Sequence, residues 1–288
     1  MKISVVTVAY KSHDILKKSI ESFFKYNDMG KEIEYILVDN SPIAERVDKY
    51  LPKNILENII YIPANNKGFG AGNNLGSLYA SGEILAFINP DIIFVEPIFT
   101  KIYEQFVADR TIALVGCKLL YEDLSPGFSF YYDYKYSIIK KWTLKLWNKL
   151  NYFNADSMYI AGADLFIRKN VFLECGKFDE KIFMYYEEPD IIRRIKEIGN
   201  WKILFDKRLQ MIHLEKKSTP NTLNSVKYEF DSAIYYGKKY NLNYKRKIKF
   251  EYEYYKLKKM IYSIICKNKA DAMERIIEFI KNNYEKYF

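Results

Sequence analysis

In this chain of 288 residues, the surroundings of Asp91 in the sequence suggest a metal-binding role. Asp91 follows Asn89 and Pro90 directly after an apolar run, so a stiff turn presents its carboxylate. A hard divalent cation that bridges two phosphates needs few protein oxygens, because phosphate and water complete its coordination shell. Asp91 is therefore a candidate ligand for Mg²⁺ or Mn²⁺. An ordinary turn aspartate is the alternative at this point.

A second group of acids lies in the segment 185–190, where three carboxylates fall within four residues: Glu187, Glu188 and Asp190. A helix start explains them structurally, because the helix dipole favours acids in the first turn. Crowded carboxylates also raise one another's proton affinity, which is how a general base is prepared. Asp190 has the spacing to pair with Arg193 and Arg194 on a helix. Glu188 is then the freer candidate for proton abstraction.

His213 and a glycine-rich stretch give weaker signals. His213 follows the apolar run 209–212, and an imidazole there could contact a metal or a phosphate or have a purely structural role. Residues 65–74 have neither the phosphate-loop nor the dinucleotide spacing of glycines. Their glycines would still let the backbone approach a ligand closely.

The elements that must position these residues alternate between strands and helices in the first half of the chain. Strands are predicted over 3–8, 34–38, 59–62, 83–88 and 112–116, and helices over 13–24, 73–80 and 98–108, with Ser12 as the first N-cap. This order predicts βαβ units and a mostly parallel sheet. A ligand of such a sheet lies outside the carboxyl ends of its strands. Three loop pairs should therefore meet at one crevice: Ala9 and Tyr10, Asp39 and Asn40, Asn89 and Asp91.

The second half of the chain predicts further elements and a boundary. A helix is expected within 136–150, a strand over 159–167 around Gly162, a short helix over 171–175, a helix over 188–198 and a strand over 201–205. From residue 222 onward the pattern is helical throughout. We expect a catalytic domain over 1–220 and a helical, basic, tyrosine-rich extension over 221–288, divided at Ser218–Asn221.

Composition limits the kind of protein this can be. The formal net charge is +9, and residues 244–259 carry seven Lys or Arg against two Glu. Such a basic, aromatic stretch could meet nucleic acid, an anionic membrane or an acidic glycan, or could be a solvated helix face. Three separated cysteines predict a reducing cytoplasm, and neither a signal-peptide pattern nor an 18-residue apolar run is present. We expect a cytoplasmic protein that is soluble or peripheral.

Five segments form an ordered set of motifs. In chain order they read VVTVAYKS, ILVDNS, NKGFGAGNN, INPD and FDEKIFMYYEEPD, at Val5–Ser12, Ile36–Ser41, Asn66–Asn74, Ile88–Asp91 and Phe178–Asp190. Together they resemble the family 2 glycosyltransferases of the GT-A fold, in the branch that contains bacterial rhamnosyltransferases. Several ordered motifs over about residues 3–218 are much more specific than any one of them. The resemblance implies an α/β fold of GT-A type, with a mostly parallel, Rossmann-like sheet flanked by helices.

The resemblance also implies residue roles. The donor nucleotide and sugar would contact the following positions: Thr7, Ala9, Tyr10, Asp39, Asn40, Lys67, Gly68, Asn73, Asn74, Asn89 and Asp91. Asp91 would hold Mg²⁺ or Mn²⁺ on the diphosphate, with His213 as a second contact, and Glu188 would deprotonate the acceptor hydroxyl. A single displacement at the anomeric carbon would invert its configuration.

The chain departs from the family pattern at three points. Glu188 stands where relatives carry aspartate, and Leu214–Lys217 replaces the residues that often follow the family histidine. Asp164 is acidic where relatives carry a small or apolar residue, and it could contact a sugar or cap a turn. Glu187 and Asp190 are further candidates for the acceptor or sugar.

The resulting hypothesis is an inverting hexosyltransferase of bacterial surface polysaccharide synthesis. Its donor would be dTDP-rhamnose or a UDP-sugar, and its acceptor a glycan, lipid-linked at the inner face of the cell membrane, where the basic extension and the Trp142–Trp147 segment would contact anionic headgroups. An oligomer is compatible with the sequence. The alternatives are a basic nucleic-acid-binding protein, for which no recognised module is present, and a sugar nucleotidyltransferase, for which a second phosphate loop is missing.

Overall fold

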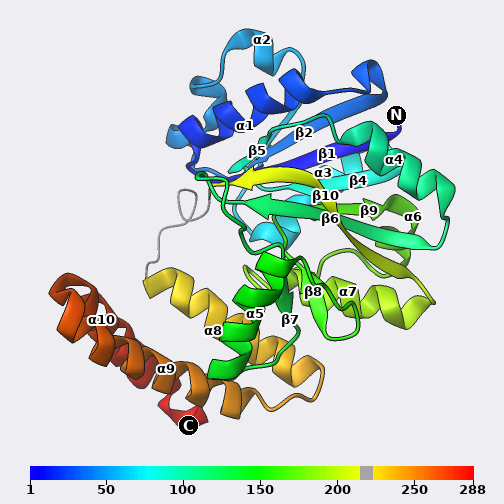
Figure 1. Ribbon diagram of the computed structural model, residues 1–288. Coiled ribbons are helices and arrows are strands. Elements are labelled where there is room, and N and C mark those ends of the chain that lie inside the picture. Colours follow the sequence, from blue (N-terminus) through cyan, green and yellow to red (C-terminus); the bar gives the residue numbers. More distant parts are fainter. Residues whose placement is uncertain (215–222) are drawn as a thin grey trace.

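The chain folds around one eight-stranded, curled sheet with helices on both faces. The computed structural model describes residues 1–214 and 223–288 (Figure 1). The strand order is β3-β2-β1-β4-β9-β6-β10-β5. The strands of this sheet are β1 (Ile3–Ala9), β2 (Ile33–Asp39), β3 (Ile60–Pro63), β4 (Ile84–Ile88), β5 (Ile92–Phe94), β6 (Ile112–Leu120), β9 (Asp164–Arg168) and β10 (Lys202–His213).

The first half of the sheet is parallel, as the alternation of strands and helices predicts. β1 pairs in parallel with both β2 and β4, and β2 with β3. Two strands run the other way: β9 is antiparallel to both β4 and β6, and β5 is antiparallel to β10 at the edge. The reversed strands matter for function, because each brings a distant segment to the carboxyl end of a parallel strand.

Apolar helix faces cover the two sides of the sheet. α1 (His13–Tyr26) and α4 (Phe99–Ala108) pack in one core layer, through residues such as Phe23 and Phe99. α6 (Lys169–Glu174) and α7 (Glu187–Ile198) pack in the other layer, through residues such as Phe172 and Ile191. The remaining helices of the first two hundred residues are α2 (Lys53–Leu56), α3 (Phe69–Tyr79) and α5 (Ile138–Leu150).

Three of the predicted elements differ from the structure. α3 begins at Phe69, not at residue 73, because packing on the 178–187 segment overrides the low helix propensity of its glycines. The strand predicted over 159–167 is two strands in different sheets, since β8 (Met158–Ile160) pairs with β7 (Phe130–Tyr132) before the chain turns at Gly162 into β9. The apolar runs around 203 and 211 form one strand, β10, with an irregularity between Asp206 and Gln210.

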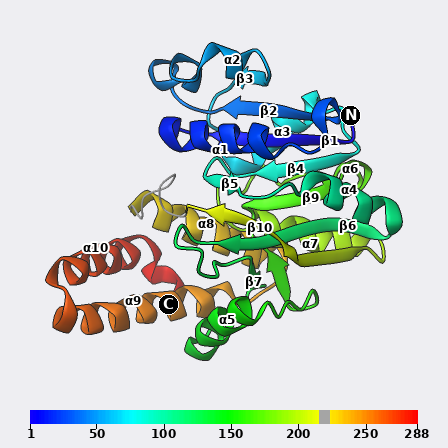
Figure 2. The same ribbon diagram turned by 45° about the horizontal axis from the view of Figure 1, so that its top comes forward.

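The C-terminal helices are α8 (Leu223–Lys239), α9 (Tyr244–Ile265) and α10 (Lys267–Tyr284). α9 and α10 form a hairpin on the side of the molecule away from α1 and α2, as two views show (Figures 1 and 2). α8 lies between this hairpin and the sheet, and Tyr186, from the acid-rich segment 185–190, packs against its core cluster. The boundary expected at Ser218–Asn221 lies outside the described residues.

Candidate functional site

Asp91 and His213 lie together at the edge of the sheet. The antiparallel pairing of β5 with β10 places His213 opposite Ile92, directly after Asp91. Asp91 Oδ1 is 3.4 Å from His213 Nε2, and the Leu214 N–H donates to the Asp91 carbonyl oxygen at 3.0 Å. Asp91 is buried and His213 is partly exposed. The two candidate metal ligands therefore converge, although β6 and β9 come between their strands in the sequence.

A carboxylate oxygen and an imidazole nitrogen together suit Mn²⁺, and the carboxylate alone suits Mg²⁺. Across the described residues, no three His, Cys, Asp or Glu side chains gather to hold a metal by themselves. A metal at this position would need further ligands from phosphate and water. The donor set thus fits a cation that arrives with a diphosphate and not a resident structural ion.

The turn that carries Asp91 is joined to the segment that faces Glu188. β4 pairs with β9 so that Ile88 lies opposite Asp164, and the Asn89 N–H donates to the Ala163 carbonyl oxygen at 3.0 Å. Gly162 comes one residue earlier, and a Cβ built there would lie 2.7 Å from the Glu188 Cδ. A short backbone bridge, residues 162–163, therefore connects the Asp91 turn with the Glu188 carboxylate.

The three acids at the start of α7 have different surroundings. Burial raises the pKa of the half-buried Glu188, and backbone hydrogen bonds, including one from Gly162, oppose that shift. Burial, followed by the charge of Glu188, raises the pKa of Glu187 well above its ordinary value. Glu187 is only 2% exposed, and its Oε1 has no hydrogen-bond partner among the described residues. Of the three, Glu188 combines access with a raised pKa, which suits a general base.

Asp190 is fully engaged in ion pairs. Its Oδ2 accepts from Arg194 at 2.7 Å, and its Oδ1 accepts from Lys239 at 2.6 Å and from Tyr240 at 2.8 Å. The predicted pairing with Arg194 is confirmed, whereas the pairing with Arg193 is wrong, because Arg193 reaches Asp133 instead. Asp190 fastens α7 to α8 and does not face a ligand.

The glycine-rich stretch is fixed to the segment before α7. Gly68 has a φ of +106°, and a Cβ there would lie 2.9 Å from the Phe183 Cα. The Asn74 side chain accepts from the Phe178 N–H at 3.0 Å and donates to its carbonyl oxygen at 2.9 Å. Asn73 donates to the Phe69 carbonyl oxygen within α3, and Lys67 is exposed. The two asparagines thus position backbone, whereas Asn65, Asn66 and Lys67 are open to solvent.

The ends of β1 and β2 lie side by side, but the side chains at these ends differ in their exposure to solvent. Asp39 is buried and accepts from the Ser41 N–H, the Val47 N–H and the Tyr61 hydroxyl. Thr7 is also buried, and its hydroxyl accepts from Tyr35 at 2.8 Å, so the structure does not bring this side chain to the crevice. Ala9 and Asn40 are buried at the strand ends, where the Asn40 N–H donates to the Ala9 carbonyl oxygen, and Tyr10 is exposed.

Two further predicted residues, Asp164 and Asn89, adjoin the backbone bridge. Asp164 is completely buried and accepts from the Cys117 N–H at 2.5 Å, while its other oxygen has no partner among the described residues. Burial raises its pKa well above the ordinary aspartate value. The Asn89 side-chain oxygen is likewise buried and without a described partner. Unsatisfied buried oxygens are rare in folded proteins, and each needs a specific explanation such as strain, a catalytic role or a bound water or ion.

The structure adds an aromatic stack that the sequence analysis missed: Phe128, Tyr131 and Tyr159. The Tyr131 and Tyr159 rings are 5.8 Å apart across the β7–β8 pair, and Phe128 stacks on Tyr131 at 5.7 Å. All three are half-buried. After burial, the charge of Glu188 is the next contribution that raises the pKa of Tyr159, so the stack lies near the candidate base. The cross-strand pairing that forms it had no signal in the sequence.

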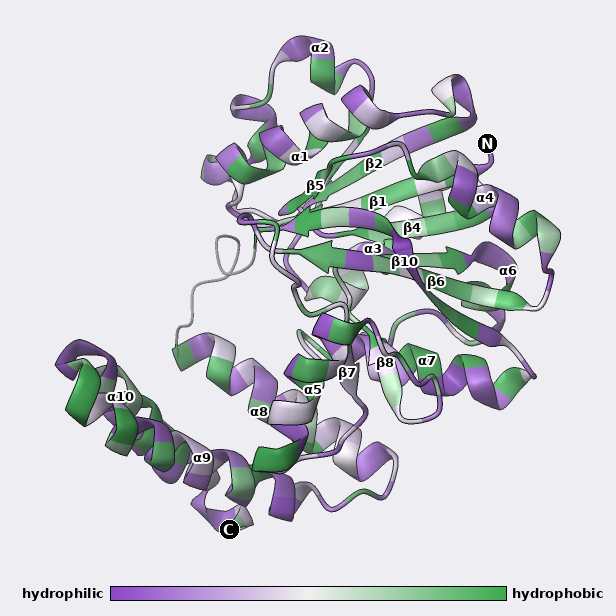
Figure 3. Cartoon of the chain, viewed as in Figure 1, coloured by the Kyte–Doolittle hydropathy of each residue, from purple (hydrophilic) through white to green (hydrophobic). Residues whose placement is uncertain are grey.

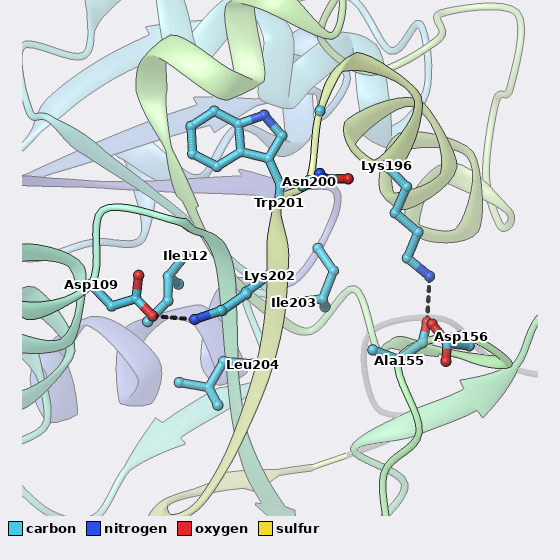
Figure 4. Close-up of a pocket in the computed structure, with 11 residues that line it drawn as sticks. Asp109, Ile112, Ala155, Asp156, Lys196, Asn200, Trp201, Lys202, Ile203 and Leu204 are labelled. Atoms are coloured by element: carbon cyan, nitrogen blue, oxygen red, sulfur yellow. Dashed lines mark hydrogen bonds and ion pairs between the residues drawn. The ribbon is translucent and has the colours of Figure 1, made fainter.

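A separate surface pocket lies at the other end of the sheet. It is lined by Asp109, Ile112, Trp201 and Lys202, among others, and Lys202 forms an ion pair with Asp109 at 2.8 Å (Figure 4). Ile112 and Lys202 are the first residues of β6 and β10. The pocket is therefore remote from Asp91 and His213, which lie at the carboxyl end, and no role in the chemistry follows from it.

Two curated relatives are a rhamnosyltransferase and a teichoic acid biosynthesis protein. The chain is 24% identical over 216 residues to the rhamnosyltransferase WbbL of Escherichia coli (strain K12), covering 68% of this chain and 78% of WbbL. It is 30% identical over 105 residues to the minor teichoic acid biosynthesis protein GgaB of Bacillus subtilis (strain 168), covering 36% of this chain but 12% of GgaB.

Solved structures share the fold. S. aureus TarS matches with a TM-score of 0.53 at 16% identity, over 81% of this chain and 39% of TarS. The mannosyltransferase PcManGT from Pyrobaculum calidifontis, in complex with GDP-Man and Mn²⁺, matches with a TM-score of 0.56 at 10% identity, over 82% of this chain and 64% of that one. The predicted GT-A fold is thereby confirmed. The model of the family "Glycosyl transferase family 2" matches residues 4–167, more than half of the sequence, and the chain belongs to that family.

Proposed function

We propose that this glycosyltransferase is metal-dependent and inverting, and that it moves rhamnose or another hexose from a nucleoside-diphosphate sugar to a glycan hydroxyl. The observation that carries the proposal is the backbone bridge 162–163. It holds the Asp91 turn on one side and the Glu188 carboxylate on the other. One short segment would thus hold both the leaving-group site and the base.

The donor would lie along the carboxyl ends of β1, β2 and β4. Its neighbours there would be Asn40, Tyr10 and the exposed Lys67. The buried Asp39 would contribute indirectly, because it holds the following loop through the N–H groups of Ser41 and Val47. Asp91 and His213 would hold Mg²⁺ or Mn²⁺ against the diphosphate. Bound there, the cation supplies positive charge that stabilises the departing nucleoside diphosphate.

Glu188 would act at the acceptor. Its carboxylate takes the proton of the acceptor hydroxyl, and the oxygen attacks the anomeric carbon from the face opposite the diphosphate. The bond from that carbon to the phosphate oxygen breaks, and the nucleoside diphosphate leaves with the electron pair. Burial that raises the pKa of Glu188 strengthens it as a proton acceptor, so long as it stays ionised at the working pH.

The aromatic stack would receive the acceptor sugar. Sugar rings present apolar C–H faces, and aromatic side chains offer large, rigid apolar surface with little loss of conformational freedom on binding. Phe128, Tyr131 and Tyr159 present three half-buried, stacked rings, and Tyr159 is near enough to Glu188 for its charge to raise the pKa of the Tyr159 hydroxyl. We expect this stack to position an acceptor hydroxyl for deprotonation.

The relatives support the substrate class. WbbL is a rhamnosyltransferase and GgaB a teichoic acid biosynthesis protein, and structures similar to this fold contain GDP-Man or UDP. We propose dTDP-rhamnose or a UDP-sugar as donor and a surface polysaccharide precursor as acceptor, lipid-linked on the cytoplasmic face of the membrane. Within the residues that the structure describes, no helix is long and apolar enough to span a bilayer.

Product analysis tests the reaction. A panel of nucleotide sugars with Mn²⁺ or Mg²⁺ should yield nucleoside diphosphate, whereas release of pyrophosphate would identify a nucleotidyltransferase instead. Asp91→Ala should lose the metal-dependent thermal shift with the donor, and Asp271→Ala, exposed on α10, is its control. Glu188→Gln should bind donor but transfer 10²–10⁴-fold more slowly, with the exposed Glu57→Gln as control. Full transfer by Glu188→Gln would refute its assignment as base.

A further inference from the structure

The outer face of α5 is an apolar stripe open to solvent. Ile139 and Trp142 are 73% and 75% exposed, and Leu146 and Leu150 are 48% and 57% exposed. These positions are spaced by three or four residues, so they share one side of the helix. We call this set the α5 stripe. A contiguous exposed apolar surface of this kind marks an interaction site.

The stripe is held outward by the contacts of the opposite face. Asn148 is buried, accepts from the Ser129 N–H at 2.8 Å and donates to the Phe130 carbonyl oxygen at 3.1 Å. Trp147 donates through Nε1 to the Tyr132 hydroxyl at 2.9 Å. α5 is therefore fastened to β7 along one side, and the stripe cannot turn inward without breaking these hydrogen bonds.

The charge on α5 indicates what covers the stripe. The helix contains four lysines and no acid, and Lys145 and Lys149 are exposed beside the stripe. Lysine is depleted at the cores of protein–protein interfaces. Helices that lie in a bilayer surface instead combine lysines with an apolar face containing Trp and Leu. The composition thus favours an anionic lipid surface over a protein partner.

A second exposed apolar group lies at the end of α9. Ile264 and Ile265 are 85% and 73% exposed, and Met260 and Ile261 are exposed beside them. Lysines flank this group at 258, 259, 267 and 269. α5 and the α9–α10 hairpin lie on the same side of the molecule, away from α1 and α2 (Figures 1 and 2), and hydrophobic segments are visible on both (Figure 3).

We propose that the α5 stripe inserts into the surface of an anionic bilayer, with the end of α9 as a second contact. The stripe would enter the boundary between headgroups and acyl chains while Lys145 and Lys149 meet lipid phosphates. α5 is hydrogen-bonded to β7 and its flanking residues, and β7 carries Tyr131 of the aromatic stack. Binding of the α5 stripe to a bilayer would therefore bring the proposed acceptor site to the membrane. The purpose of this contact rests on the proposed function, but lipid binding itself does not.

Vesicle binding tests the proposal. The full-length chain should co-sediment with phosphatidylglycerol-containing vesicles and much less with pure phosphatidylcholine. Ile139→Asn/Trp142→Asn/Leu146→Asn should lower the partition coefficient at least tenfold. The matched control is Leu78→Asn/Tyr79→Asn/Val107→Asn, which changes equally exposed apolar residues on α3 and α4 and should bind as wild type. Lys145→Gln/Lys149→Gln should weaken vesicle binding about fivefold per lysine. The control is Lys17→Gln/Lys18→Gln on α1, which should bind as the wild type does.

Depth and alternative partners are measured separately. Brominated lipids should quench the fluorescence of the wild type, and Trp142→Phe should bind normally but lose most of the quenching. Vesicle binding unaffected by the stripe triple variant would overturn the proposal. So would a stripe-dependent dimer in light scattering without vesicle binding. The triple variant should still release nucleoside diphosphate with a water-soluble acceptor. If the proposed reaction itself is wrong, the wild type will also fail in this assay, so that failure is distinct from a loss of lipid binding.

Discussion

The Glu188 carboxylate lies directly against the backbone of Gly162, with no room for a side chain between them. A Cβ at residue 162 would meet the Glu188 Cδ at 2.7 Å and its Cγ at 2.8 Å. Real Cβ atoms do not approach other atoms so closely. Gly162 is therefore required by the position of the candidate base and not by its own backbone conformation.

Gly162→Ala should displace the Glu188 carboxylate and lower kcat by about 10²-fold, since misplacement by an ångström removes catalytic alignment. The donor site lies on the other side of the bridge, so the dissociation constant of the nucleotide sugar should change little. Steady-state kinetics and donor titration by calorimetry measure the two quantities.

A double variant distinguishes displacement from general damage. Aspartate is one methylene shorter than glutamate, so Glu188→Asp draws the carboxylate back from residue 162. We expect Gly162→Ala to cost much less in the Glu188→Asp background than in the wild type. Equal losses in both backgrounds would show that Gly162 acts through something other than Glu188.

Transfer should depend on pH through Glu188. Burial raises its pKa, and the base must be ionised to accept a proton, so kcat should fall as pH drops through that raised value. The acidic limb of the pH profile should have a slope of one and a midpoint above the ordinary glutamate pKa. Glu188→Gln should have a low rate without this limb. An unchanged acidic limb in Glu188→Gln would assign the titration to another group.

Asp164 should make stability depend on pH in the opposite sense from an ordinary aspartate. Its folded pKa is raised by burial, so the neutral form contributes stability at low pH, and this is lost as pH rises through the folded value. Asp164→Asn keeps an acceptor for the Cys117 N–H and removes the titration. We expect its Tm to exceed that of the wild type by several degrees on the alkaline side. A Tm that is lower than that of the wild type at every pH would contradict this account.

The parallel half of the sheet and its strand-end loops could be predicted because each depends on local patterns. The runs at Ile3–Ala9 and Ile33–Asp39 are apolar throughout, and turn residues follow them. Asp91 lies 3.4 Å from His213 because of β5, a three-residue strand too short to be recognised from sequence.

The roles of individual polar residues depended on contacts between distant segments. Asp39 looked free to bind a ligand, yet Val47 and Tyr61 occupy its carboxylate. Asn74 looked like part of a ligand loop, yet it holds Phe178. Local sequence cannot indicate which carboxylate or amide a partner from elsewhere will satisfy, because the partner is set by tertiary packing.

The contacts of the C-terminal extension with α7 likewise depend on tertiary packing and have no signal in the local sequence. Lys239, in α8, donates to Asp190 at 2.6 Å and to Asp179 at 2.7 Å. Asp179 precedes Glu187 and Glu188 in the sequence and Asp190 follows them, so Lys239 holds both flanks of this pair. Lys239→Met should lower both Tm and kcat, because Asp190 is completely buried and loses one of its two cations. Lys238→Met, exposed on the neighbouring position, is the matched control. A drop in Tm with kcat unchanged would show that α8 stabilises the fold without positioning α7, whereas a matched loss of both would make the extension part of the catalytic unit.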